Sequence, residues 1–152
     1  MLFLLTVIAI IVFDQAAKYF FTLRLTGGSF INCGVFDIRI VHNTGTAFGL
    51  FAGNNTFFVI LSLLAIAAIS VLMVQSAKKN LLFKICFALI LSGAASNLID
   101  RVRVGYVVDY IDFRFWPVFN IADSAITVGT AVLIISILGS EKGKGMLSGC
   151  TR

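Results

Sequence analysis

The chain has 152 residues, of which 59% are hydrophobic and only 12% are charged, and its formal net charge is +5. This composition excludes an ordinary water-soluble protein, so we predict an integral membrane protein. We interpret the positive charge as attraction to anionic lipid, because no basic stripe with interleaved aromatic residues indicates nucleic-acid binding.

Four apolar runs are long enough to cross a bilayer, which needs about 20 residues per helix. We predict spanning helices at residues 2–23, 56–75, 81–99 and 119–138. The first run also has the length of a signal-peptide core, but no basic residue precedes it and apolar residues continue beyond it, so we expect it to be retained. Without repeats or linkers, residues 1–152 are expected to form one domain.

Four spans place both termini on one side of the membrane, and the basic residues of short loops decide which side that is. The loop between the second and third runs is short and purely basic, with Lys78 and Lys79 close to Lys84. The cations of the opposite side are mixed with aspartates. We therefore predict both termini in the cytoplasm and two outer segments, residues 26–55 and 102–118.

Both outer segments contain strand-like patterns. Residues 36–41 combine partial alternation with β-branched side chains, and residues 106–116 alternate so that Asp109 falls on the apolar face. Extended backbone near lipid must be shielded or paired, so we predict a small sheet at the outer, periplasmic-side surface. The expected fold class is an all-α membrane protein with four transmembrane helices and this small β-cradle.

Cysteine and histidine offer little chemistry. Cys33, Cys86 and Cys150 have no paired spacing, and His42 is the single histidine, so we expect neither a metal site nor a disulfide. A Ser-His-Asp device would need His42 as its base, and a neutral loop histidine is the commoner case.

The carboxylates and amides remain. Asp14 and Lys18 are four residues apart and are expected to pair on one helix face. Asn97 and Arg101 have the same spacing and are expected to share a face near the outer end of their helix. Asp100 is expected to have a structural role or to reach the membrane interface, as charged residues at helix ends do.

Asp109 is harder to explain structurally, because an unpaired acid on an apolar face costs several kcal/mol. For Asn120 and Asp123, a helix capping box and a functional site are equally good interpretations. If the fold brings Asp109 against Asp123, the two share a proton and provide the acid and base of an aspartic protease. Asn43 would then hold a substrate backbone, and Gly45 would permit its close approach.

Five segments in order make the chain resemble the lipoprotein signal peptidases, the type II signal peptidases of bacteria. These segments are residues 14–18, 43–48, 93–101, 105–111 and 116–124. The resemblance implies a peptidase of the bacterial cytoplasmic (inner) membrane that cuts prolipoproteins immediately before a diacylglyceryl-modified cysteine. Ser92 and Ser96 stand where the family often has glycine. This departure bears on helix packing and not on the chemistry.

The resemblance also implies residue roles. Asp109 and Asp123 would be the catalytic dyad, with the substrate site formed by Asn43, Gly45, Asn97, Arg101 and Asn120. The supporting residues would be Asp14, Lys18, Gly93 and Ala122. We expect a monomer that contacts lipid and prolipoprotein, uses no cofactor or metal, and has its active site toward the outer face.

Two alternatives remain open. A small proton-coupled transporter or channel subunit would use Asp14, Lys18, Asp109 and Asp123 as a relay, although these residues cluster toward one end of the helices. A non-enzymatic assembly factor would use the acids only as helix caps. The tail, residues 140–152, matches no motif.

Overall fold

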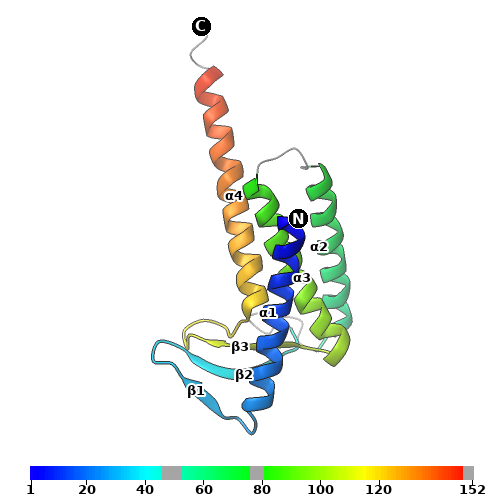
Figure 1. Ribbon diagram of the computed structural model, residues 1–152, viewed down its shortest axis with the longest axis vertical. Helices are drawn as coiled ribbons and strands as arrows, with labels where there is room; N and C mark the ends of the chain where they lie inside the picture. The colour runs from blue at the N-terminus through cyan, green and yellow to red at the C-terminus, as the bar shows by residue number, and fades with distance from the viewer. Residues whose placement is uncertain (46–52, 76–80, 149–152) are drawn as a thin grey trace.

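The computed structural model describes residues 1–45, 53–75 and 81–148, and the side chains of these residues up to 139. Four helices stand side by side, and a small sheet crosses one end of the bundle, called here the sheet end (Figure 1). The elements in order are α1 (Leu2–Arg24), β1 (Phe30–Asn32), β2 (Asp37–Asn43), α2 (Asn55–Gln75), α3 (Leu81–Val104), β3 (Val107–Asp112) and α4 (Ile121–Ser148). α1 begins, and α4 finishes, away from the sheet end.

The prediction of four membrane-spanning helices is confirmed, because each helix contains a stretch long and apolar enough to cross a bilayer. Three predicted bounds differ by more than one residue, and the largest difference is at the end of α4, which continues from residue 138 to Ser148. α3 continues from residue 99 to Val104, and Gly105 follows it with φ +87°, a conformation that glycine adopts without strain. α4 begins at Ile121 rather than 119, because Phe119 bridges to Ile111 of β3 and Asn120 caps the helix.

α3 is the central helix of the bundle. In the apolar stretch of α3 that is long enough to cross a membrane, 44% of the residues are buried, whereas the share in the other three helices is 6% to 17%. Outward-facing side chains of α1 and α2, such as Val12 and Leu64, are exposed apolar groups. This distribution is that of a membrane bundle, in which lipid replaces water at the apolar surface.

α3 and α4 approach closely through small residues. A Cβ atom at Gly93 would collide with the backbone carbonyl oxygen of Ala122, and one at Gly129 would lie 2.9 Å from the carbonyl oxygen of Cys86. Small residues permit such backbone contact between membrane helices. The contact at Gly93 fixes the first turn of α4 against the middle of α3.

The sheet has the order β1-β2-β3 with antiparallel pairing. The predicted strand at 36–41 is present as β2, and the strand predicted at 106–116 stops at Asp112, because the chain turns at Arg114 with φ +67°. Asp37 and Asp112 face each other across the strands, and each is neutralised by an arginine: Arg114 binds Asp37, and Arg39 binds Asp112. β1 was not predicted.

The Gly93 contact yields a stability prediction. Gly93→Ala should lower the free energy of unfolding by about 1–3 kcal/mol, because the added methyl group meets the Ala122 backbone as well as the Ile126 side chain, and the backbone cannot move aside cheaply. Gly139→Ala is the matched control, since a Cβ atom there meets open space; alanine should be neutral or stabilise the helix by up to about 1 kcal/mol. Thermal unfolding in detergent measures both, and equal melting temperatures for the two variants would contradict the close approach.

Candidate active site

The first turn of α4 holds Asp123 through reciprocal capping. The Asp123 backbone N–H donates to Asn120 Oδ1 at 2.8 Å, and the Asn120 N–H donates to Asp123 Oδ2 at 3.2 Å. The capping box predicted from these two residues is therefore present. Asp123 Oδ1 also accepts a bond from Asn97 Nδ2 of α3 at 2.8 Å, so this carboxylate does more than cap its own helix.

Asp109 lies in β3 and is 1% exposed. Its Oδ2 accepts a hydrogen bond from Asn43 Nδ2 at 2.8 Å, and its Oδ1 accepts one from Asn120 Nδ2 at 2.7 Å. Asn43 is the last residue of β2, and the β2–β3 pairing brings it beside the Asp109 strand. The acid that the strand pattern placed on an apolar face is thus supplied with amide donors from two elements.

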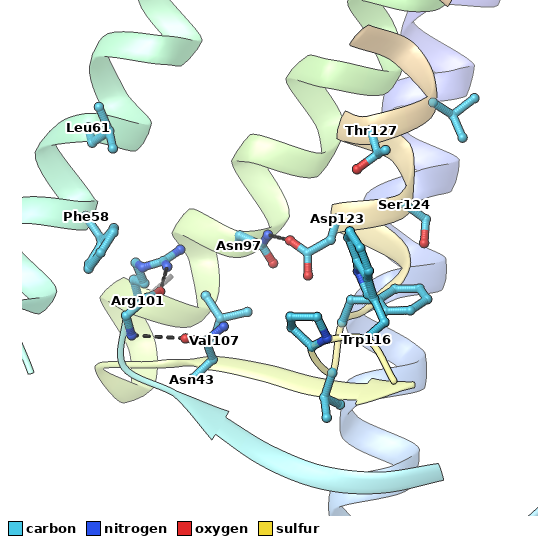
Figure 2. Close-up of a pocket in the computed structure, with 15 residues that line it drawn as sticks. Asn43, Phe58, Leu61, Asn97, Arg101, Val107, Trp116, Asp123, Ser124 and Thr127 are labelled. Carbon is cyan, nitrogen blue, oxygen red and sulfur yellow. Dashed lines mark hydrogen bonds between the residues drawn. The ribbon is translucent and has the colours of Figure 1, made fainter. Parts of the chain in front are cut away.

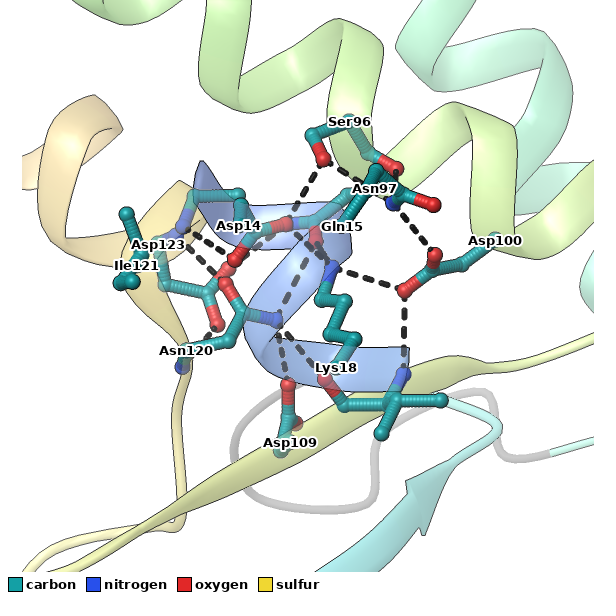
Figure 3. Close-up of polar contacts among 12 residues, drawn as sticks. Asp14, Gln15, Lys18, Ser96, Asn97, Asp100, Asp109, Asn120, Ile121 and Asp123 are labelled. Carbon is teal, nitrogen blue, oxygen red and sulfur yellow. Dashed lines mark hydrogen bonds and ion pairs between the residues drawn. The ribbon is translucent and has the colours of Figure 1, made fainter. Parts of the chain in front are cut away.

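Two asparagine side chains join the two carboxylates. Asn120 Nδ2 donates to Asp109 Oδ1 and also lies 3.2 Å from Asn97 Oδ1, while Asn97 Nδ2 donates to Asp123. Figure 3 shows Asn120 between the two aspartates at the junction of β3 and α4. Asp109 and Asp123, fourteen positions apart, therefore belong to one network.

The environment raises the pKa of Asp109 from 3.8 to about 7. The largest cause is burial, which disfavours the charged carboxylate, followed by the negative charge of Asp123. The hydrogen bond from Asn43, the charge of Lys18 and the hydrogen bond from Asn120 oppose the rise. Near neutral pH this carboxyl is therefore poised between its protonated and ionised forms.

A cavity of about 680 Å³ opens beside this network, between α2, α3, α4 and the segment that follows β3 (Figure 2). Asn43, Asn97 and Asp123 form its polar side, and apolar residues that include Phe58 and Leu61 form the opposite wall. Asp123 faces the cavity directly, whereas Asp109 lies behind Asn43.

Arg101 stands at the edge of the cavity. Its guanidinium group lies over the Phe58 ring, 5.0 Å from the centroid, and its Nη2 is 3.4 Å from the Gly45 carbonyl oxygen. The Gly45 N–H in turn donates to Asn43 Oδ1 at 3.0 Å. These contacts place a cation and backbone polar groups at the cavity mouth; the rest of the predicted segment 43–48 lies outside the described residues.

The supporting residues are buried beside the network. Lys18 and Asp14 form the predicted ion pair, with Nζ 2.7 Å from Asp14 Oδ2. Of the two roles predicted for Asp100, the structure has the structural one and not the interfacial one: Asp100 is 5% exposed and binds the same ammonium group at 2.7 Å. Its spacing of three residues from Asn97 places it on the inward face of α3, and this signal was available in the sequence.

Two polar contacts in this region were not predicted. Gln15 Nε2 donates to Asp100 Oδ1 at 2.7 Å, and Ser96 Oγ donates to Asp14 Oδ2 at 2.7 Å. The Ser96 hydroxyl is fully buried between α1 and α3, so it contributes a hydrogen bond as well as packing.

The other sequence candidates lie apart from this site. His42 stacks on Tyr106, with ring centroids 4.2 Å apart. Cys33 is an exposed free thiol and Cys86 a buried one. Cys150, the basic loop at Lys78 and Lys79, and the end of the tail fall outside the part of the chain that the structure describes. Within that part, no cluster of three His, Cys, Asp or Glu side chains is arranged to hold a metal.

The chain is similar to known proteins over most of its length. The family model described as Signal peptidase (SPase) II matches residues 6–139. A lipoprotein signal peptidase of Halothermothrix orenii is 36% identical over 140 residues, covering 91% of this chain and 96% of that protein. A lipoprotein signal peptidase of Staphylococcus aureus strain MRSA252 is 35% identical over 147 residues, covering 93% and 90%.

Two solved structures have the same architecture. A bacterial membrane enzyme determined by the in meso method at 2.3 Å resolution superposes with a TM-score of 0.88 at 32% identity, covering 93% of this chain and 90% of that chain. A second, determined by the same method at 1.9 Å resolution, has a TM-score of 0.80 at 33% identity, covering 90% and 92%.

The raised pKa of Asp109 predicts a pH-dependent stability. The folded chain keeps this proton up to about pH 7, whereas the unfolded chain loses it near 3.8, so the free energy of unfolding falls as pH rises between these values. The melting temperature of the wild type should therefore drop from about pH 5 to about pH 8, and Asp109→Asn should show a smaller drop.

Asp37→Asn is the control for that measurement. Arg114 holds the pKa of Asp37 below its ordinary value, so the stability that its carboxylate contributes is complete above about pH 5. This variant should keep the wild-type slope. The same slope in Asp109→Asn as in the wild type would show that Asp109 stays ionised in the folded protein.

Proposed function

The chain belongs to the signal peptidase II family, and from that premise we propose that Asp109 and Asp123 are the catalytic pair with which it cleaves prolipoproteins before a diacylglyceryl-modified cysteine. The chain is a membrane-embedded peptidase with four spanning helices. One observation carries the assignment of the pair: two carboxylates from β3 and α4 are joined through asparagine amides, and one of them, Asp123, lines a cavity. The transporter alternative finds no support in the relatives.

The two carboxylates have different tasks in this proposal. Asp123 faces the cavity, where water reaches its carboxylate, and donors from Asn97 and the Asn120 N–H hold that carboxylate in place, so it acts as the general base for water. Asp109 has a pKa raised to about 7, so it carries the proton that is donated to the scissile carbonyl oxygen.

The reaction then follows the course of an aspartic peptidase. Asp123 takes a proton from water while the water oxygen bonds to the scissile carbonyl carbon, and Asp109 protonates the carbonyl oxygen. When the C–N bond breaks, the leaving nitrogen receives the proton that Asp123 took up. Asp109 recovers its own proton as the carbonyl reforms, and the pair returns to its starting state.

Asn43 lies between Asp109 and the cavity, which suggests how the substrate reaches the buried acid. Its Nδ2 donates to Asp109 Oδ2. A substrate carbonyl that takes the place of this contact leaves the amide free to bond the substrate backbone instead. Arg101 and Gly45 at the cavity mouth, together with Asn97 and Asn120, complete the proposed substrate site.

The apolar wall of the cavity fits a lipid-modified substrate. Phe58, Leu61 and Val128 line the side that continues along the membrane helices. We propose that both termini lie in the cytoplasm and that the sheet end faces outward, since the site would then meet the peptide where it leaves the bilayer. The carboxylates bind amide donors, which have the wrong polarity for a cation, so the proposed reaction needs no metal; we expect a monomer in contact with lipid.

Matched asparagine variants test the assignment. Asp109→Asn and Asp123→Asn should each reduce cleavage of a diacylglyceryl-modified prolipoprotein by at least about 100-fold, because each removes one proton-transfer group. Asp37→Asn should retain activity, because Asp37 pairs with Arg114 and does not line the cavity. The purified variants are compared at equal thermal stability, with and without a chelator. Near-full activity in either dyad variant would reject the assignment, and full inhibition by the chelator would reject a metal-free reaction.

The Asn43 contact predicts a shift in the pH profile. Its hydrogen bond lowers the pKa of Asp109, so Asn43→Ala should raise that pKa further. Because the basic limb of kcat/KM reports loss of the essential acid in the free enzyme, this limb should move to higher pH. Thr44→Ala, which changes the exposed neighbour, should leave the limb in place. A move to lower pH in Asn43→Ala would assign the limb to a different group.

A further inference from the structure

Two aspartates outside the proposed pair each hold the backbone immediately before one of its members. Asp14 Oδ1 accepts the N–H of Ala122, the residue before Asp123, at 3.1 Å. Asp100 Oδ2 accepts the N–H of Val108, the residue before Asp109, at 3.2 Å. The Ala122 N–H lies in the first helical turn, where no intrahelical acceptor exists, so Asp14 supplies the partner from another helix.

Lys18 joins these two supporting carboxylates. Its Nζ lies 2.7 Å from Asp14 Oδ2 and 2.7 Å from Asp100 Oδ2, and it donates to Asn97 Oδ1 at 3.0 Å. An ammonium group has three donors, and all three are used. Lys18 is 3% exposed, and Figure 3 shows its side chain reaching from α1 into the middle of the network.

The third bond of Lys18 fixes the orientation of an amide. Lys18 and Asn120 both donate to Asn97 Oδ1, so the Asn97 Nδ2 group must point the other way, toward Asp123. A flipped Asn97 would place its oxygen against a carboxylate and its NH₂ group against an ammonium. The charge on Lys18 therefore ensures that Asp123 receives a donor.

We propose that Lys18 is a positioning residue: through Asp14 and Asp100 it sets the separation of the two backbone segments that carry Asp123 and Asp109, and through Asn97 it aims a donor at Asp123. Asp14, Lys18 and Asp100 together are called the Lys18 clamp. The inference rests on the proposed function for its effect on catalysis. Lys18 does not line the cavity, so the clamp has no direct contact with substrate and acts through the groups that it positions.

The kinetic test compares Lys18→Met with Lys84→Met in the full chain. Lys84 is an exposed lysine near the opposite end of α3, so it controls for loss of a lysine. Because a misplacement on the order of 1 Å can cost about 100-fold in rate, kcat of Lys18→Met should fall by about that factor. Its KM should stay within about threefold, and Lys84→Met should match the wild type in both constants. A purely structural lysine would lower the melting temperature while kcat of the folded enzyme stayed unchanged.

A second readout does not depend on activity. Residue-resolved amide hydrogen exchange in detergent reports the Val108 and Ala122 N–H groups, which bond to Asp100 and Asp14 and not to Lys18. Both amides should exchange faster in Lys18→Met and at the wild-type rate in Lys84→Met. If Lys18→Met fails to fold, Asp14→Ala removes the acceptor of the Ala122 N–H and should release that amide alone, and Asp100→Ala should release the Val108 amide alone, each with a fall in kcat.

The outcomes separate the clamp from the dyad. Unchanged exchange at both amides, or a loss of activity carried entirely by KM, would overturn the clamp. The activities of Asp109→Asn and Asp123→Asn are measured alongside. If both variants are inactive while the Val108 and Ala122 amides exchange at the wild-type rate in Lys18→Met, the clamp alone fails. If they remain active, the proposed function fails, and the exchange rates still decide whether Lys18 holds the two segments.

Discussion

A carboxylate that leaves water for the interior of a membrane bundle must find hydrogen-bond donors, a cation or a proton, and this requirement governs the sheet end of the molecule. Asp14 and Asp100 use the ammonium group of Lys18, whereas Asp109 and Asp123 receive neutral amides. Among the described residues, the buried side-chain polar atom left without a partner is Asn55 Oδ1. The charges are therefore held at fixed places, which is a condition for directed proton transfer.

The two ways of stabilising a buried carboxylate, by a cation or by neutral amides, correspond to two different roles in the molecule. A carboxylate paired with a cation serves as an anchor for backbone N–H groups, as Asp14 and Asp100 do. A carboxyl bonded only to amides and placed near another acid is free to change its protonation, as the raised pKa of Asp109 indicates. Close packing of Gly93 against Ala122 brings the carboxylates paired with Lys18 next to the carboxyls bonded to amides, because it sets the first turn of α4 directly on α3.

The sequence predicted the elements that depend on apolar length, since a spanning helix is determined by run length alone. It also indicated Asp109, because an acid on the apolar face of a strand requires a partner. β1 escaped prediction because its three residues are all exposed and show no alternation. The spacing of Asp100 from Asn97 indicated an inward face, but its partners, Lys18 and the Val108 N–H, could not be predicted because they come from other elements. The roles of the dyad came from family resemblance joined to this reasoning, and the network that links the two aspartates required the structure.

The proposed mechanism depends on a neutral carboxyl at Asp109. Infrared spectroscopy of the wild type and Asp109→Asn, both with ¹³C-labelled aspartate, observes this group directly. A protonated carboxyl has a C=O stretch that the carboxylate lacks. We predict that the wild type shows this labelled band below neutral pH and loses it near pH 7, and that the band is absent from Asp109→Asn. An unchanged band in the variant, or no protonated aspartate in the folded wild type below neutral pH, would contradict the proposed division between acid and base.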